Sequence, residues 1–222
     1  VDLSVIAKFA KDNNIISVCD NTFCSPYIQK PLDFGIDIVV HSATKYLNGH
    51  SDVVGGVVVC AEDREDLSDD MFYLSNSVGG ILSPFDSFLL LRSLKTLSVR
   101  MDRHCESALK LSKFLENHKA IEKVIYPGLI SHPQHHVAKK QMHKFGGMIT
   151  AILKGGLNAS KTFLENTKIF SLAESLGGVE SLIEHPAIMT HASVPQRVRE
   201  QIGIEDGLSL IHISEPTRPN CI

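Results

Sequence analysis

Several features that mark common protein classes are missing from this sequence of 222 residues. It has no tryptophan, no Cys-x-x-Cys pair and no excess of charge of one sign. The 22 Lys and Arg residues against 25 Asp and Glu argue against a nucleic-acid partner. No apolar run is long enough to span a bilayer, and the first ten residues do not form a signal peptide, so no membrane association is expected. The five cysteines indicate reduced thiols, which predicts a cytoplasmic protein.

Short β-branched runs separated by helical or loop segments occupy the first 60 residues. Residues 2–14 place apolar side chains at helical spacing, and apolar runs follow at 15–20, 37–42 and 55–60. Because these runs are uniformly apolar, they predict strands covered on both faces in a parallel or mixed α/β sheet. The 16 residues between Asp20 and Asp37 suffice for a crossover connection.

A long helix is predicted to join two domains. Ser83 is the expected N-cap, Pro84 takes the first helical position and Asp86 lies three residues after the cap. Residues 85–118 contain neither Gly nor Pro. A stretch of that length is expected to bend or break once, near residues 100–104.

The second half of the chain has shorter elements of mixed type. Strands are expected at 121–128, 146–155 and 168–175, with a helix from about 159 to 166. A His-rich loop is expected at 131–136, and Pro195 opens a further short helix. The pattern predicts a smaller α+β domain.

An amine, hydroxyls and a carboxylate follow two neighbouring predicted strands. Asp20 closes one strand and Thr22 follows it, whereas Ser42, Thr44 and Lys45 come just after the next strand. Ligands of open α/β sheets bind at the carboxyl ends of strands, so these side chains are expected to face one crevice. Pyridoxal phosphate needs such groups, because a lysine forms a Schiff base, a carboxylate keeps the pyridine nitrogen protonated and hydroxyls hold the phosphate. The spacing alone also allows a solvated lysine beside residues that merely cap backbone groups.

Three segments resemble the pyridoxal-phosphate-dependent trans-sulfuration enzymes of cysteine and methionine metabolism. They are DNTFCSPY at 20–27, HSATKYLNGHSDVVGG at 41–56 and SLAESLGGVESLIEHPAIMTHAS at 171–193. The resemblance extends from residue 3 to about residue 208 and is greatest to the branch of cystathionine γ-lyases and γ-synthases. It implies an α/β protein of the aminotransferase-like fold type I, assembled as homo-oligomers that are dimers of dimers.

The resemblance also implies a domain division and a set of cofactor-binding residues. Residues 1–97 would be the C-terminal part of the cofactor-binding large domain, 98–208 the small C-terminal domain, and 209–222 a tail that does not resemble the family. Lys45 matches the catalytic Schiff-base lysine, Asp20 the partner of the pyridine nitrogen, and Thr22 a threonine beneath the ring. Ser42 and Thr44 match hydroxyls that bind the phosphate.

An amino-acid substrate follows from the same resemblance. Ser175 matches a residue near the substrate carboxylate, and Glu174 matches a specificity position. The implied reaction is α,γ-elimination from cystathionine to cysteine, 2-oxobutanoate and ammonia, as in a γ-lyase. A γ-replacement of the synthase type is the alternative.

Two departures from the family pattern leave a third interpretation open. The family's upstream portion is absent, so the chain looks like a fragment of about half a subunit. Leu210 takes the place of an arginine that grips the substrate carboxylate through paired N–H donors. A catalytically incompetent fragment that only associates with full-length subunits is therefore a rival hypothesis.

Eleven histidines raise the question of a metal site. His132, His135 and His136 cluster, but their spacing follows no zinc pattern and no cysteine pair accompanies them. We expect no bound metal.

Overall fold

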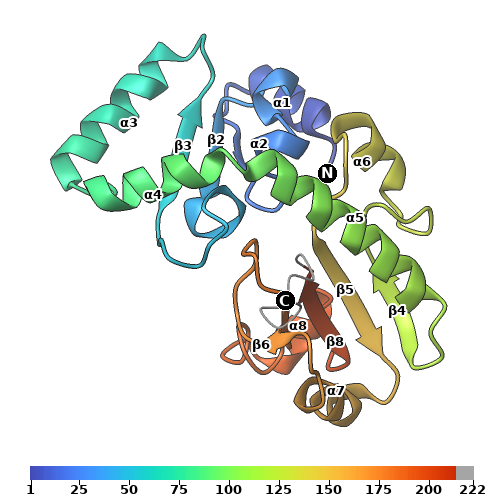
Figure 1. Cartoon of the computed structure of the whole chain (residues 1–222). Coiled ribbons are helices and arrows are strands. Elements are labelled where there is room, and N and C mark those ends of the chain that lie inside the picture. Colours follow the sequence, from blue (N-terminus) through green and yellow to red (C-terminus); the bar gives the residue numbers. More distant parts are fainter. Residues whose placement is uncertain (214–222) are drawn as a thin grey trace.

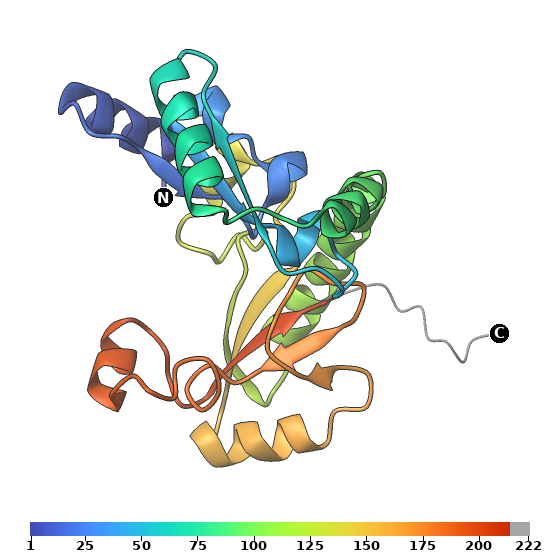
Figure 2. The ribbon, with the colours of Figure 1, turned by 90° about the vertical axis from the view of Figure 1, so that its left-hand side faces the viewer.

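Two separate β-sheets form the two lobes of the molecule, and a long helix runs from one lobe to the other (Figure 1). The computed structural model describes residues 1–213. The predicted C-terminal tail, with Cys221, therefore lies largely outside the described residues. Figure 2 shows the two lobes as an upper and a lower layer, with the long helix beside both.

The first lobe contains a mixed sheet of three strands in the order β1-β2-β3. Strands β1 and β2 are parallel, with Asp20 opposite Val40, and β3 is antiparallel to β2, with Gly56 opposite Ser42. The crossover between β1 and β2 is confirmed. The strands are β1 (Val18–Asp20), β2 (Ile38–Ser42) and β3 (Gly56–Cys60), and the helices are α1 (Leu3–Asp12), α2 (Ser25–Ile28), the 3₁₀ helix η1 (Pro31–Phe34), the π-helix η2 (Ala43–Leu47) and α3 (Glu65–Val78).

The prediction that these strands are covered on both faces is wrong for the outer two. Val18 of β1 is 59% exposed, and Val58 of β3 is 51% exposed. Helix α1 packs Leu3 and Ala7 against Ile36 and Val39, which closes one side of the sheet near β2. Helix α3 contacts β3 but covers only part of it, so Val58 stays half exposed.

The predicted long helix is broken into α4 (Pro84–Leu94) and α5 (Leu97–Glu116). Ser83 caps α4 as expected, because its hydroxyl accepts the Asp86 N–H at 3.0 Å. The break lies at residues 95–96 and not at 100–104. The Thr96 hydroxyl donates to the Ser93 carbonyl at 3.0 Å, which turns the chain at this point.

The second lobe is a five-stranded sheet in the order β4-β5-β8-β7-β6. Its three predicted strands are present, although the last, β6, is short; the prediction missed β7 and β8. Part of the predicted His-rich loop is helical, since α6 begins at His135. The strands are β4 (Ile121–Ile125), β5 (Met148–Leu153), β6 (Ser171–Leu172), β7 (Leu182–Glu184) and β8 (Leu208–His212), and the helices are α6 (His135–Gln141), α7 (Gly156–Glu165) and α8 (Gln196–Gln201).

Strand β8 begins at Leu208, where the family resemblance was expected to end, and continues into the predicted tail. It lies between β5 and β7, with Leu210 opposite Thr150 on one side and opposite Glu184 on the other. Residues 208–212 thus complete the interior of the second sheet.

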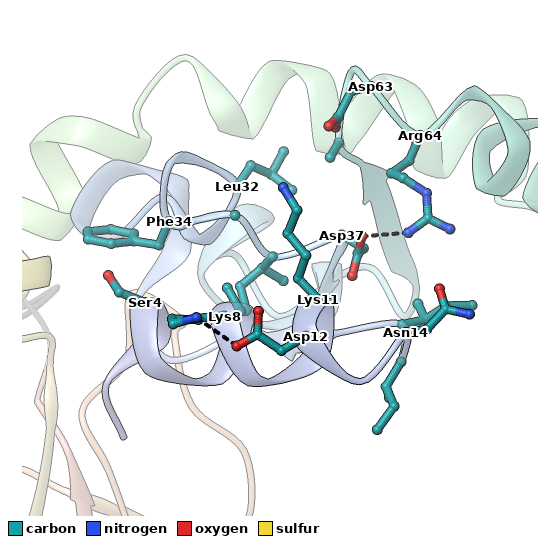
Figure 3. Close-up of a pocket in the computed structure, with 16 residues that line it drawn as sticks. Ser4, Lys8, Lys11, Asp12, Asn14, Leu32, Phe34, Asp37, Asp63 and Arg64 are labelled. Carbon is teal, nitrogen blue, oxygen red and sulfur yellow. Dashed lines mark hydrogen bonds and ion pairs between the residues drawn. The ribbon is translucent and has the colours of Figure 1, made fainter.

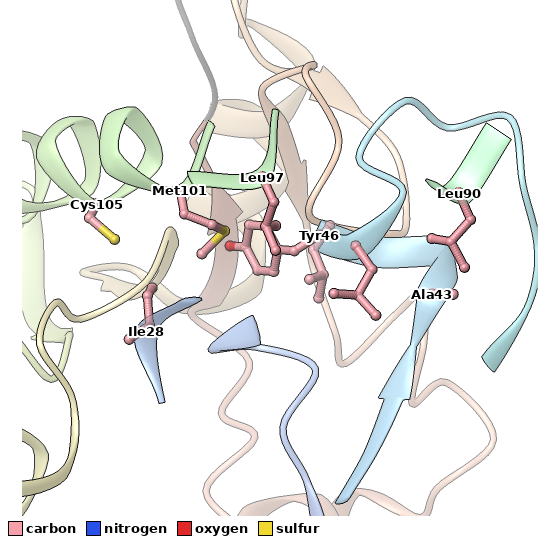
Figure 4. Close-up of a cluster of buried hydrophobic side chains, with 9 residues drawn as sticks. Ile28, Ala43, Tyr46, Leu90, Leu97, Met101 and Cys105 are labelled. Carbon is pink, nitrogen blue, oxygen red and sulfur yellow. The ribbon is translucent and has the colours of Figure 1, made fainter. Parts of the chain in front are cut away.

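Helix α5 contributes to the cores of both lobes. Leu97, Met101 and Cys105 pack with Tyr46 between the lobes (Figure 4), and Ala108 lies against the second sheet. Leu176, far along the chain, joins the cluster shared by the lobes. This shared core holds the carboxyl end of β2 against the second lobe.

Candidate functional site

Lys45 lies in a π-helical turn that begins where β2 ends. The Asn48 N–H donates to the Ala43 carbonyl at 3.0 Å, and the Ala43 N–H donates to the Gly55 carbonyl at 2.8 Å. Inside this turn Lys45 has φ −92° and ψ −128°, which is not helical. The distorted backbone lets the lysine side chain leave the turn while Tyr46 and Leu47 stay buried.

The structure brings three of the predicted cofactor-binding residues into one hydrogen-bonded chain. Asp20 Oδ1 accepts the Thr22 N–H at 3.0 Å, and Thr22 Oγ1 accepts the Ser42 N–H at 2.8 Å. The parallel pairing of β1 and β2 puts their carboxyl ends side by side, which is why these residues meet. Asp20 is thereby oriented beside the start of the lysine turn.

Both predicted phosphate-binding hydroxyls remain able to donate. Thr44 Oγ1 accepts the Gly55 N–H at 3.0 Å, while its own contact to the Gly55 carbonyl is long, at 3.4 Å. The Ser42 hydroxyl makes no hydrogen bond within residues 1–213. Each hydroxyl has one proton and two lone pairs, so both can donate to an anion without breaking a short bond.

The second lobe reaches Lys45 through the loop at residues 173–178. Lys45 Nζ donates to Ser175 Oγ at 3.0 Å, and Ser175 has a positive φ of 110°. A Cβ at Gly177 would lie 2.4 Å from the Tyr46 nitrogen and 2.7 Å from the Lys45 carbonyl carbon. Only glycine lets the loop pack this closely on the lysine backbone. Glu174, the predicted specificity residue, is exposed at the start of this contact.

Three buried rings lock the lysine turn to β8. Tyr46, His104 and His212 have ring centroids 5.1–5.6 Å apart. His212 Nε2 donates to the Gly178 carbonyl at 3.0 Å, which leaves Nδ1 to accept from the Tyr46 hydroxyl at 3.4 Å. Burial lowers the pKa of both His104 and His212 to about 4. Both imidazoles are therefore neutral in the folded protein.

A buried carboxyl also faces this region from β7. Glu184 is 7% exposed, and its Oε2 atom has no hydrogen-bond partner. Burial raises the pKa of Glu184 and the charge of Glu174 raises it further, whereas Lys45 opposes the rise. Leu210 stands directly opposite on β8, so the arginine that the family resemblance implies there would face this carboxyl.

Two cavities border the first sheet, one between β1 and the second lobe and one at the amino ends of β1 and β2. One of about 580 Å³ is lined by Asp20, Thr150 and Leu210, among others. Another, of about 680 Å³, lies at the amino end of β2 (Figure 3). There Arg64 pairs with Asp37 at 2.5 Å and Lys8 with Asp12 at 2.6 Å. Because these charges are paired and remote from Lys45, we place the chemistry at the carboxyl ends of the strands.

Other candidate chemistry finds little support in the described residues. Residues 1–213 contain no group of three His, Cys, Asp or Glu side chains placed to hold a metal ion. Across the same residues no helix has the length and apolar character needed to cross a membrane. Cys19, Cys24, Cys60 and Cys105 are free thiols. Burial raises the pKa of Cys24 to about 12, which argues against a reactive thiolate.

Three further residues belong to this site but were not predicted from the sequence: Gly177, His212, and Arg100, whose guanidinium donates to the Tyr46 carbonyl at 2.8 Å. Arg100 and His104 interrupt the apolar stripe of α5, and a polar residue in a buried stripe is a signal that could have been followed. Gly177 belongs to the AESLGG motif. His212 carried no signal, because its burial depends on β8 entering the sheet.

Comparisons with known proteins identify the family of the chain. The family model "Cys/Met metabolism PLP-dependent enzyme" matches residues 1–214. A cystathionine β-lyase of Coxiella burnetii is 61% identical over 207 residues, and a cystathionine γ-lyase of Dictyostelium discoideum is 54% identical over 207 residues. Each alignment covers 93% of this chain and 53% of the relative. The chain thus spans about half the length of these curated relatives.

Solved structures show the same similarity. A cystathionine γ-synthase from Xanthomonas oryzae pv. oryzae in complex with cystathionine matches with a TM-score of 0.93 and 47% identity. The match covers 96% of this chain and 55% of that structure. A cystathionine γ-lyase from Lactobacillus plantarum, complexed with L-serine, gives a TM-score of 0.92 at 47% identity. These findings confirm the expected fold class, and the chain belongs to the Cys/Met metabolism PLP-dependent enzyme family.

Proposed function

We propose that this chain carries the lysine half of a pyridoxal phosphate site that cleaves a carbon–sulfur bond in a sulfur amino acid, in the manner of a cystathionine γ-lyase. The observation that carries the proposal is the meeting of Lys45 with Ser175 at 3.0 Å, beside the Asp20–Thr22–Ser42 network. The family match and the similarity to enzymes named for cystathionine support it.

The residues present fit this cofactor. Lys45 offers an accessible amine, and the Ser42 and Thr44 hydroxyls can donate to a phosphate. Asp20 uses Oδ1 for the Thr22 N–H, and its Oδ2 makes no hydrogen bond within residues 1–213. When bound, the cofactor would supply an aldehyde to the amine and a ring that accepts electrons from the substrate. Asp20 Oδ2 would hold the proton on the ring nitrogen.

Lys45 would then transfer protons, and Ser175 would orient the lysine amine and the substrate. Lys45 Nζ, once neutral, can take the proton from the substrate's α-carbon. Elimination then also requires loss of a proton from the β-carbon, and the sulfur substituent leaves from the γ-carbon with the bonding electrons. The Ser175 hydroxyl orients Nζ through the contact already present, and it would orient the substrate carboxylate. Glu174, at the rim of the same loop, would select among substrate side chains.

Two other reactions stay as candidates. The similarity to a γ-synthase supports γ-replacement by a thiol. The 61% identity to a relative named cystathionine β-lyase supports cleavage on the β side of the sulfur.

The non-catalytic alternative is an incompetent fragment that associates with full-length subunits. Leu210, in place of a carboxylate-binding arginine, supports this rival. Negligible turnover of cystathionine by the isolated chain, together with failure of pyridoxal phosphate to label Lys45, would favour this rival. Assembly as dimers of dimers and a cytoplasmic location remain predictions.

Borohydride trapping tests the cofactor site directly. The purified chain would be incubated with pyridoxal phosphate, reduced and mapped by peptide mass spectrometry. We expect the pyridoxyl mass mainly on Lys45. The Lys45→Arg variant should lose this label, whereas Lys95→Arg, which replaces an exposed lysine, should keep the label on Lys45. Labelling spread evenly over surface lysines would contradict the proposal.

A further inference from the structure

Arg100 connects the lysine turn to the break between α4 and α5. Its Nη1 donates to the Tyr46 carbonyl at 2.8 Å, and its Nη2 donates to the Leu47 carbonyl at 3.4 Å. On the other side Nη2 donates to the Ser93 carbonyl at 3.1 Å and Nε donates to Thr96 Oγ1 at 3.1 Å. One guanidinium therefore joins η2 to both helices.

This arrangement is built around a buried cation. Arg100 is 7% exposed, and burial lowers its pKa. A Cβ at Gly49 would lie 2.0 Å from Nη1, so glycine makes the room that the guanidinium occupies. Removing a cation from water is costly unless hydrogen bonds replace the lost hydration. The carbonyl oxygens at the end of a helical turn carry partial negative charge and are suitable acceptors.

The acceptors are the carbonyls of the two residues that follow Lys45. Their fixation holds the distorted backbone of Lys45 from one side, while the Gly177 backbone packs against it from the other. We propose that Arg100 is a positioning residue for Lys45: it fixes the direction in which the lysine amine leaves the turn. The inference rests on the proposed role of Lys45 but concerns only residues of this chain.

Hydrogen exchange tests the inference without the cofactor. The Asn48 and Gly49 amides donate to the Ala43 and Lys45 carbonyls at 3.0 and 2.7 Å, so they report on the turn. In Arg100→Met we expect their exchange to rise at least tenfold. Arg92→Met, an exposed arginine on α4, is the matched control and should leave both rates unchanged.

A chemical readout separates positioning from mere packing. The rate of Lys45 acetylation would be measured relative to that of the exposed Lys95 at a series of pH values. We expect the dependence of this relative rate on pH to differ from the parent in Arg100→Met and to match the parent in Arg92→Met. Arg100→Lys keeps the charge but not the planar fork, and we expect intermediate exchange and a partly restored profile. If Arg100→Met does not fold, as judged by circular dichroism, the Arg100→Lys variant decides.

Unchanged Asn48 and Gly49 exchange together with an unchanged Lys45 profile in a folded Arg100 variant would overturn the inference. Failure of pyridoxal phosphate to label Lys45 in the parent chain would instead count against the proposed function. The two results are distinguishable, because the exchange experiment contains no cofactor.

Discussion

At the scale of single residues, Glu184 is unusual because it is a carboxyl group buried without full hydrogen bonding. Its carboxyl is buried on β7, one oxygen lacks a partner, and Leu210 opposite offers no charge. Burial therefore raises the pKa of Glu184, the charge of Glu174 adds to the rise, and Lys45 opposes it.

Glu184→Gln should raise the free energy of unfolding at neutral pH. Because the folded pKa lies above the unfolded value of about 4.3, the parent loses stability as pH rises through the folded pKa. The advantage of the variant should therefore be large at pH 7.5 and small at pH 4, where the carboxyl is mostly protonated in both states of the parent. Urea unfolding at the two pH values measures it. Glu122→Gln, at an exposed site on β4, is the control, and an equal advantage at both pH values would contradict the prediction.

Much of the residue-level site was predictable from local sequence. Each of the five predicted cofactor-binding residues lies at or just after the end of a strand whose β-branched run is visible in the sequence, and the crossover makes those strand ends adjacent; they are Asp20, Thr22, Ser42, Thr44 and Lys45. Their contacts with one another agree with that expectation, while their catalytic and cofactor-binding roles remain predictions. Ser175 was assigned by resemblance alone, since nothing in local pattern places it beside a lysine 130 positions earlier.

At the scale of elements, the contact between the 173–178 loop and η2 decides the shape of the site. Gly177 has φ +81° and no room for a Cβ. Gly203, after α8, has the same φ of +81°, but a Cβ added there would have nothing within 4 Å. Comparing alanine substitutions at these two glycines separates two free-energy costs of adding a Cβ: that of the left-handed backbone and that of the steric clash with Lys45 and Tyr46.

Gly203→Ala should destabilise the protein by about 1 kcal/mol, the cost of a left-handed conformation for a residue with a Cβ. Gly177→Ala should cost more, because the loop must also move away from Lys45. Urea unfolding measures both free energies, and the borohydride label on Lys45 reports the displacement. Equal destabilisation in the two variants, with equal labelling, would show that the close packing is unimportant.

The helix break shows what element-level patterns leave undetermined. The absence of Gly and Pro over residues 85–118 predicts one long helix with one irregularity, and that is confirmed. Its location at residues 95–96 depends on the Thr96 hydroxyl and on Arg100, which both bond the Ser93 carbonyl. The Thr96 bond is local, whereas the Arg100 guanidinium also binds two η2 carbonyls, so its place beside Ser93 depends on the packing of η2.

At the scale of the whole molecule, the Tyr46–His104–His212 cluster joins the lobes through neutral histidines. In the unfolded chain these imidazoles take up protons near pH 6.5, whereas in the folded state they resist protonation to about pH 4. The unfolded state thus gains protons first as pH falls. Stability is complete above about pH 6.5 and is lost on the way down to pH 4.

The free energy of unfolding should therefore fall between pH 7.5 and pH 5, by about 2 kcal/mol for each buried histidine taken alone. His41, whose pKa is also lowered by burial, adds to the same trend. Urea unfolding across this range is the measurement. His104→Gln should flatten the pH dependence, whereas the exposed His136→Gln should leave it unchanged. A flat profile in the parent would contradict the assignment of neutral buried imidazoles.

The sequence by itself determined most of the elements other than β7 and β8, the crossover of the first sheet and the gathering of Asp20, Ser42 and Lys45 at its strand ends, because periodicity, capping and β-branched runs act over a few neighbouring residues. Only the tertiary structure decided that Ser175 and Gly177 meet Lys45, that Arg100 is buried beneath the lysine turn, and that residues 208–212 complete the second sheet. The physical reason is that these contacts join residues far apart in the chain, and local sequence does not specify which distant partners a buried polar group will meet.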